Sequence, residues 1–216
     1  MEVEDKSNGY EEAAEEFMRR RNSLIGAAVV RAWSKTLPRG ASSTGTNSTT
    51  TGGSACPTAG GKACSILDLG CGHGVPISQA LINEGFAVYG VDASAKMIAA
   101  FRERFPDAHA ECSSVEDSEF FNITFDGVVA WGLMFLLSPG IQALVIRKIA
   151  RALKRGGKFI FTSPREAVTW IDVLTKREST SLGFQAYQDI LLAEGLVLSG
   201  EQSDEGENHY YLVSKP

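Results

Sequence analysis

The sequence lacks the features that mark secreted, membrane and metal-binding proteins. Its four cysteines form no Cys-x-x-Cys pair and its three histidines are scattered, so it indicates neither a disulfide framework nor a zinc site. The longest apolar stretch, residues 128–137, is too short to cross a bilayer. Residues 1–6 have neither the apolar core nor the cleavage site of a signal peptide. We therefore expect a cytoplasmic protein with no membrane segment and no bound metal.

The chain is also poor in basic clusters. Lysine and arginine number 21 against 26 aspartates and glutamates, and the formal net charge is -5. Nucleic-acid binding needs a basic protein face, so we expect no nucleic-acid partner. Hydrophobic residues make up 44% of the 216 residues, which is enough for one sizeable core.

What the sequence does contain is a glycine-rich turn after an apolar strand. Residues 66–74 read Ile-Leu-Asp-Leu-Gly-Cys-Gly-His-Gly, and a helix is expected at 75–83. Glycine has no Cβ, so such a turn lets the backbone approach a ligand closely. The next strand, at 86–91, runs into Asp92, 24 residues after Asp68, where a carboxylate can bind ribose hydroxyls. The pattern predicts a nucleoside-binding cleft.

Two other glycine-rich motifs fit less well. Counting Gly-x-Gly-x-x-Gly from Gly70 puts Val75 in the last position, which is a poor dinucleotide fingerprint. Ala63 follows Gly61-Lys62 where a P-loop has serine or threonine. An oxidoreductase on a related sheet and a plain strand-to-helix turn stay open as alternatives.

Strand and helix patterns alternate along the chain, which predicts an α/β fold with a parallel, doubly wound sheet and helices on both faces. Only six residues join the last two expected strands, at 196–202 and 209–214, so these must be antiparallel. The predicted organisation has three parts: N-terminal helices in 1–39 that pack on or over the cofactor cleft, a disordered Ser/Thr/Gly-rich insertion at 40–63, and a core at 64–216.

The segment 68–74 and Asp92 resemble the first motifs of the class I S-adenosylmethionine-dependent methyltransferases, and we expect the small-molecule branch of that family. Further matches follow in chain order in residues 90–94, 125–131 and 151–161. The resemblance covers about residues 10–216. It implies a Rossmann-like sheet of seven strands, mostly parallel with a reversed last strand. It also implies S-adenosyl-L-methionine as methyl donor and S-adenosyl-L-homocysteine as product.

The resemblance also implies a set of residues around the methyl donor. Asp92 would bind the ribose hydroxyls, because one carboxylate can accept from both. Ser114 stands where the family has an acid for the adenine amine, so backbone near Val115 or the Glu116 side chain would take that contact. The carboxylate of the methionine end needs a donor, for which Arg19 or Arg20 is the candidate. The predicted cofactor-binding residues are Asp68, Gly70, Cys71, Gly72, Gly74, Asp92, Ala93, Ser94, Ser114, Val115, Ala130, Trp131 and Arg19.

Substrates of open parallel sheets bind beyond the carboxyl ends of the strands, and that rule selects the acceptor side. The predicted substrate-binding residues are Trp131, Met134, Phe135, Arg165, Trp170, Asp172 and His209. His209 is also the predicted catalytic base, because histidine titrates near neutral pH. Asp172 and the acidic segment 204–207 favour an amine-bearing acceptor.

We therefore expect in-line transfer of the methyl group to O, N or S of a small metabolite. A non-catalytic regulatory protein that binds S-adenosylmethionine is the alternative. The identity of the acceptor and the oligomeric state are left open by the sequence.

Overall fold

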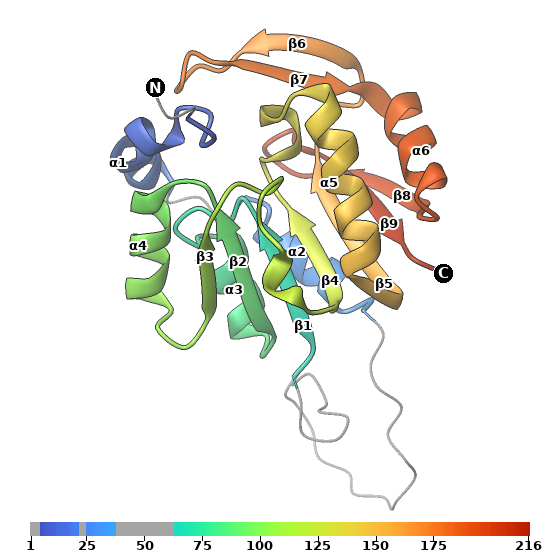
Figure 1. Ribbon diagram of the computed structural model, residues 1–216, viewed down its shortest axis with the longest axis horizontal. Helices are drawn as coiled ribbons and strands as arrows, with labels where there is room; N and C mark the ends of the chain where they lie inside the picture. Colours follow the sequence, from blue (N-terminus) through green and yellow to red (C-terminus); the bar gives the residue numbers. More distant parts are fainter. Residues whose placement is uncertain (1–4, 22–24, 38–62) are drawn as a thin grey trace, which may run out of the picture.

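The computed structural model describes residues 5–21, 25–37 and 63–216. The insertion expected at 40–63 lies, apart from Ala63, outside these residues. A seven-stranded sheet in the order β3-β2-β1-β4-β5-β9-β8 forms the centre of the fold (Figure 1). Its strands are β1 (Ser65–Leu69), β2 (Ala87–Asp92), β3 (His109–Cys112), β4 (Phe125–Ala130), β5 (Leu153–Thr162), β8 (Val197–Ser203) and β9 (His209–Ser214).

Strands β1 to β5 pair in parallel, and β9 runs antiparallel to both β5 and β8. This confirms the predicted Rossmann-like sheet with its reversed last strand. Because β1 to β4 are parallel, their carboxyl ends meet at one edge of the sheet. At that edge the glycine turn follows β1, Asp92 is the last residue of β2, and Trp131 follows β4.

Helices cover both faces of the sheet. They are α1 (Tyr10–Arg20), α2 (Ala27–Ser34), α3 (Ile77–Asn83), α4 (Ala95–Arg104), α5 (Pro139–Ala152) and α6 (Gly183–Ala193), with two short 3-10 helices, η1 (Phe120–Asn122) and η2 (Met134–Leu136). Within the described ranges, no helix combines the length and the apolar character that a bilayer crossing requires.

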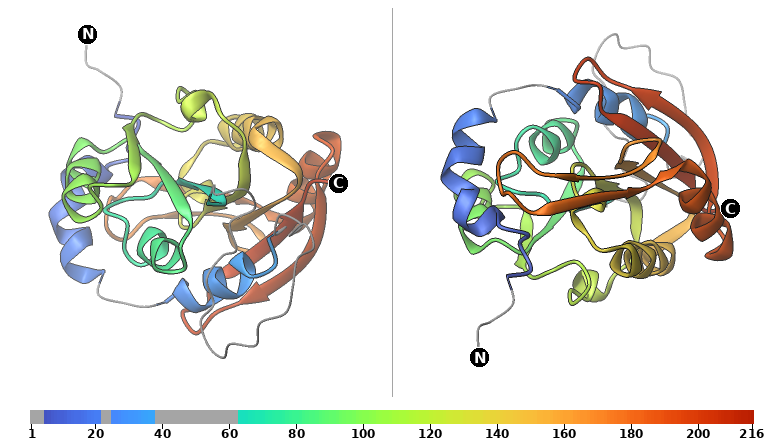
Figure 2. Two further views of the ribbon diagram at one scale, coloured as in Figure 1. Left: turned by 90° about the horizontal axis from the view of Figure 1, so that it is seen from below. Right: turned by 90° about the horizontal axis from the view of Figure 1, so that it is seen from above.

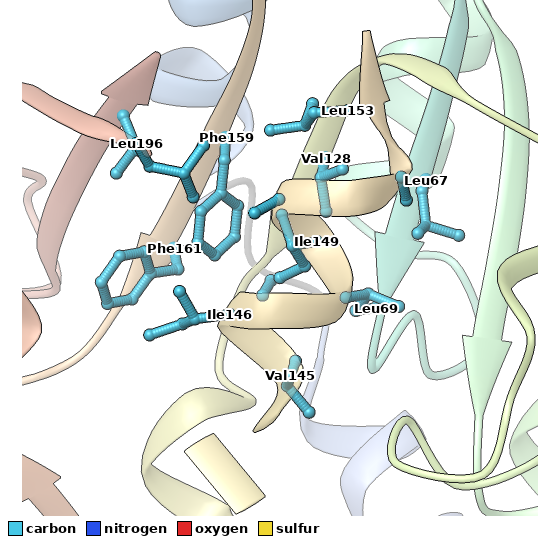
Figure 3. Packing of buried hydrophobic residues seen from close by; sticks show 14 of the residues in the cluster. Leu67, Leu69, Val128, Val145, Ile146, Ile149, Leu153, Phe159, Phe161 and Leu196 are labelled. Carbon is cyan, nitrogen blue, oxygen red and sulfur yellow. The ribbon is translucent and has the colours of Figure 1, made fainter. Parts of the chain in front are cut away.

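The alternation of side chains along the strands divides the core between these faces. Leu67 and Leu69 of β1 face α5, where Val145, Ile146 and Ile149 pack against them (Figure 3). On the opposite face, Ile66 joins a second cluster with side chains of α2 and α3. Asp68 has the same parity as Ile66, so its carboxylate points toward α3 rather than into the larger core.

A hairpin outside the main sheet was not expected from the sequence. Among the described strands, β6 (Ala167–Ile171) and β7 (Glu178–Leu182) pair with each other and not with the main sheet. The hairpin lies across the top of the sheet, and its tip reaches toward α1 (Figure 2, right). A Cβ on Gly9 would lie 3.0 Å from Cβ of Thr175, so the residue before α1 and the hairpin tip are in contact. This contact closes the upper side of the edge where the parallel strands end.

Candidate active site

A pocket lies between the carboxyl ends of the parallel strands below and α1 with the hairpin above. From the predicted cofactor set it is lined by Asp68, Gly70, Cys71, Gly72, Asp92, Ala93, Ser114, Val115 and Trp131. From the predicted substrate set it is lined by Trp131, Phe135 and Asp172. The other predicted residues, Gly74, Ser94, Ala130, Arg19, Met134, Arg165, Trp170 and His209, do not line it.

The glycine turn and the end of β2 are joined through Asp92. One carboxylate oxygen accepts the N–H of Gly72 at 2.8 Å and the other accepts the N–H of Ser94 at 2.9 Å. Burial raises the pKa of Asp92, although these two hydrogen bonds act in the opposite direction. Each oxygen keeps a free lone pair, so the carboxylate can still accept two hydroxyls. Asp92 thus has the geometry that ribose recognition requires.

Gly72 leaves open space on the side of its backbone that faces the pocket. Its φ is +54°, and a Cβ at this position would have its nearest neighbours at 3.8 Å on Phe17 and 3.9 Å on Met97. Protein packing alone therefore does not exclude a side chain. The absence of a Cβ instead allows a ligand to approach the backbone.

Asp68 lies beneath this turn and is only 2% exposed. Its Oδ2 accepts a hydrogen bond from the Ser78 hydroxyl of α3. Burial raises the pKa of Asp68 to about 7, and the neighbouring charge of Asp92 adds to the rise. The pocket therefore contains a carboxyl group that titrates near neutral pH.

Ser94 caps α4 beside the pocket without lining it. Its hydroxyl accepts the N–H of Met97, as a helix N-cap does, and donates to the Glu11 carboxylate of α1 at 2.6 Å. Lys6, before α1, pairs with Glu116 at 3.5 Å in the loop after β3. The N-terminal segment is thus attached to two of the loops that form the pocket.

The arginine in the pocket is Arg21, which the sequence analysis did not select. Arg19 and Arg20 lie on the exposed side of α1, where both pair with Glu16. Arg21 follows the helix, and its guanidinium carbon lies 4.8 Å from the ring centre of Phe17 and 4.1 Å from that of Trp131. Its buried Nε has no hydrogen-bond partner among the described residues. Among the described residues, Arg21 lines the pocket whereas Arg19 and Arg20 do not.

The hairpin brings Asp172 to the other end of the pocket. Its Oδ1 accepts the N–H groups of Leu174 and Thr175, both at 2.8 Å. In the described part of the chain, Oδ2 accepts no hydrogen bond and the carboxylate has no ion-pair partner. Trp170 does not line the pocket, but its ring packs on Phe135, 5.3 Å between centres, and so fixes the hairpin on η2.

His209 and Arg165 lie apart from the pocket. His209 Nε2 is 2.9 Å from Oε1 of Glu201, and Arg165 Nε donates to the same oxygen at 3.1 Å. The His209 ring packs edge-on against Tyr211, on the face of β9 that meets α6. A base must reach the proton that it removes, so the geometry does not support the predicted catalytic role of His209.

The fold and the pocket define a protein of the class I methyltransferase type: a sheet with a reversed last strand, a glycine turn after β1 and a carboxylate at the end of β2. The comparison with protein families agrees. Residues 66–157 match the methyltransferase domain family. This match spans 92 of the 216 residues, and together with the fold it indicates a methyltransferase domain with S-adenosylmethionine as methyl donor. Comparison with curated proteins gave no match.

Solved structures share the fold at low sequence identity. Magnesium protoporphyrin IX methyltransferase from Synechocystis, determined with bound S-adenosylmethionine, is 15% identical with a TM-score of 0.65, covering 99% of this chain and 98% of its own. A TehB-like methyltransferase from Corynebacterium glutamicum is 20% identical with a TM-score of 0.63, covering 97% and 98%. The glycopeptide N-methyltransferase MtfA is 16% identical with a TM-score of 0.59, covering 73% and 91%.

The residues in the pocket fit this methyl donor. Asp92 has lone pairs for the ribose, Gly72 leaves room beside the backbone, and the unpartnered Nε of Arg21 suits a carboxylate. When bound, S-adenosylmethionine supplies an electrophilic methyl group on a positively charged sulfur.

Proposed function

We propose that the protein transfers a methyl group to O, N or S of a small metabolite that bears an amine. The observation that carries the proposal is Asp172: a carboxylate at the pocket, fixed through one oxygen and without a partner for the other. An ammonium group that donates to Oδ2 would give it the ion pair that the described part of the chain does not supply.

The enclosure of the pocket supports a small acceptor. Tyr10, Phe17 and Arg21 line it from above, so the N-terminal helix acts as a cover over the cofactor cleft. Arg177 at the hairpin tip lies 3.5 Å from Asp5, which closes the same side. A pocket covered in this way suits a compact molecule, whereas a polymer requires an open groove.

The aromatic side chains support the amine. Tyr10 and Phe135 line the pocket with Asp172, and a cation is attracted to aromatic ring faces as well as to a carboxylate. Burial, followed by the charge of Asp172, raises the pKa of Tyr10 to about 12. Tyr10 therefore stays neutral and can donate a hydrogen bond to the acceptor.

The chain's residues have separate roles in this proposal. Asp92 binds the ribose and Arg21 the carboxylate of the methyl donor, while backbone of the glycine turn supports the methionine end. Asp172 orients the acceptor through its amine. Holding acceptor and donor in line supplies much of the rate acceleration, because orientation alone removes a large entropic cost.

The test uses a metabolite extract divided on a cation-exchange resin at acidic pH. Each fraction is incubated with the protein and S-adenosylmethionine labelled in its methyl group. We expect transfer to a component of the retained fraction, which holds the amines. Asp172→Asn should lower that transfer about 10- to 100-fold, because a hydrogen bond to a charged group contributes about 1.5–3 kcal/mol.

Asp107→Asn, an exposed carboxylate outside the pocket, is the matched control and should leave transfer unchanged. Label that appears only in the unretained fraction would overturn the amine assignment and leave methyl transfer standing. If no component of either fraction is labelled, the proposal of methyl transfer is overturned in favour of the alternative, a regulatory protein that binds S-adenosylmethionine without turnover.

A further inference from the structure

The Trp131 side chain connects the cofactor end of the pocket to the reversed strand. It follows β4 and lines the pocket, and one ring face lies against the Arg21 guanidinium, 4.1 Å from its carbon to the ring centre. Its Nε1 donates to the Tyr210 hydroxyl of β9 at 2.8 Å. The orientation of the indole is therefore determined by Tyr210 of β9, which does not itself line the pocket.

The Tyr210 hydroxyl is itself held in place. Tyr210 is fully buried, and its hydroxyl donates to Oδ2 of Asp204 at 2.6 Å. The other oxygen of Asp204 accepts the N–H groups of Gly206 at 2.9 Å and Asn208 at 3.0 Å, in the turn between β8 and β9. Because Asp204 is fixed, the hydrogen of the Tyr210 hydroxyl points toward Oδ2 of Asp204. The lone pairs of the Tyr210 oxygen are then free to accept the N–H of the Trp131 indole.

The backbone packs directly on this hydrogen bond. A Cβ on Gly26, which precedes α2 and has φ +85°, would lie 2.9 Å from the Trp131 indole and 3.0 Å from the Tyr210 hydroxyl. No side chain fits there without displacing one of the two. The close approach excludes water from the bond, and a hydrogen bond screened from water holds its partners more firmly.

The guanidinium of Arg21 depends on this arrangement. The rings of Phe17 and Trp131 lie against it, and contacts with ring faces leave N–H groups available for a planar anion. If the indole rotated, the arginine would lose the nearer of its two ring contacts.

We propose that Tyr210 and Asp204 are positioning residues: they fix the Trp131 ring, and through it the Arg21 guanidinium, so that Arg21 meets the carboxylate of the methyl donor. The inference rests on the carboxylate-binding role proposed for Arg21. It gives Asp204, in the turn between β8 and β9, a specific part in cofactor binding, although neither Asp204 nor Tyr210 lines the pocket.

The experiment compares two ligands by calorimetry. S-adenosylhomocysteine carries the amino-acid end with its carboxylate, and 5′-methylthioadenosine lacks it. For Tyr210→Phe we expect the dissociation constant of S-adenosylhomocysteine to rise about 3- to 10-fold, as the loss of one hydrogen bond implies. That of 5′-methylthioadenosine should change less than about twofold. In an Arg21→Met background, Tyr210→Phe should cause no further loss.

Tyr211→Phe is the matched control, because Tyr211 is the next residue of β9, faces the opposite side of the sheet and donates to the carbonyl of Pro164. It should leave both affinities unchanged. Asp204→Asn provides a second variant of the positioning pair and should show the same selective loss as Tyr210→Phe.

Equal weakening of both ligands by Tyr210→Phe and Asp204→Asn would mean a general structural role and would overturn the inference. An unchanged affinity for S-adenosylhomocysteine would overturn it as well. If Arg21→Met itself causes no selective loss, the role of Arg21 in the proposed function is wrong, and the inference fails with it.

Discussion

Replacing Asp68 with asparagine should raise the free energy of unfolding of the ligand-free protein, and this gain should grow as the pH rises. The Asp68 side chain is 2% exposed and accepts a hydrogen bond from Ser78. Burial is the main reason why its pKa rises from 3.8 to about 7. Asparagine has nearly the same shape and cannot ionise, so the variant removes the charge while keeping an oxygen for Ser78.

The sign and size of the effect follow from proton linkage. Below pH 3.8 the carboxyl group is protonated in both the folded and the unfolded chain, and it has no effect on stability. As the pH rises toward 7, the unfolded chain ionises first, so Asp68 progressively lowers the free energy of unfolding. Each pKa unit corresponds to about 1.4 kcal/mol, which gives a full penalty of about 4 kcal/mol above pH 7.

The assay is thermal unfolding of the wild type and Asp68→Asn at about pH 5 and about pH 8. Between these values the difference in stability should grow by about 2–3 kcal/mol in favour of the variant, or about 5–10 °C in Tm. Any fixed cost of burying the amide cancels in this comparison. A difference in Tm that is the same at both pH values would refute the reasoning.

Asp126→Asn is the control with the opposite sign. Burial alone would raise the pKa of Asp126, but hydrogen bonds from Lys154 and Ser65 outweigh it and lower the pKa. The folded state therefore gains from this charge, and that gain is lost as the pH falls through the folded pKa. Its removal should destabilise the protein at pH 8 rather than stabilise it.

Two further predictions test the pocket. Gly72→Ala should weaken binding of S-adenosylhomocysteine at least about tenfold by calorimetry, because a Cβ would occupy the space beside the backbone. The positive φ of Gly72 should also make the variant less stable by about 1–2 kcal/mol. Unchanged affinity would place the ligand away from the glycine turn. His209→Ala should retain methyl transfer and cofactor affinity, since its ring bonds Glu201 outside the pocket, and loss of turnover with normal folding would restore it as a candidate base.

The elements of the parallel sheet could be predicted because their signals are local. The glycine turn, Asp92 at a strand end and the short connection to β9 are each visible within a few residues of sequence. The parity of β9 was available too: once its first residue is His209, alternation places His209 and Tyr211 on one face and Tyr210 on the other. Applied to this strand, that rule predicts that Tyr210 and His209 point to opposite faces of the sheet, so both cannot point toward the same site.

The hairpin and Arg21 depend on contacts that the sequence does not display. β6 carries exposed apolar residues such as Ile171, so it shows no buried face. The position of the hairpin depends on residues distant in sequence, including Gln142 of α5, whose side chain donates to the carbonyl of Thr180 in β7. Arg21 enters the pocket because the backbone leaves the helix there, with ψ +54°, while the two preceding arginines remain in the helix.

The structure divides the site between the sheet and two additions to it. In the proposed function the ends of β1 and β2 provide the groups for the methyl donor, and their geometry follows from strand order and the glycine turn. The end proposed for the acceptor is lined by Asp172 of the hairpin and Tyr10 of α1. Changes in the hairpin should therefore alter which acceptor is used while leaving donor affinity intact. Changes around Trp131 should lower donor affinity while leaving the choice of acceptor unchanged, because its ring lies against Arg21 and its N–H is bound by Tyr210 of β9.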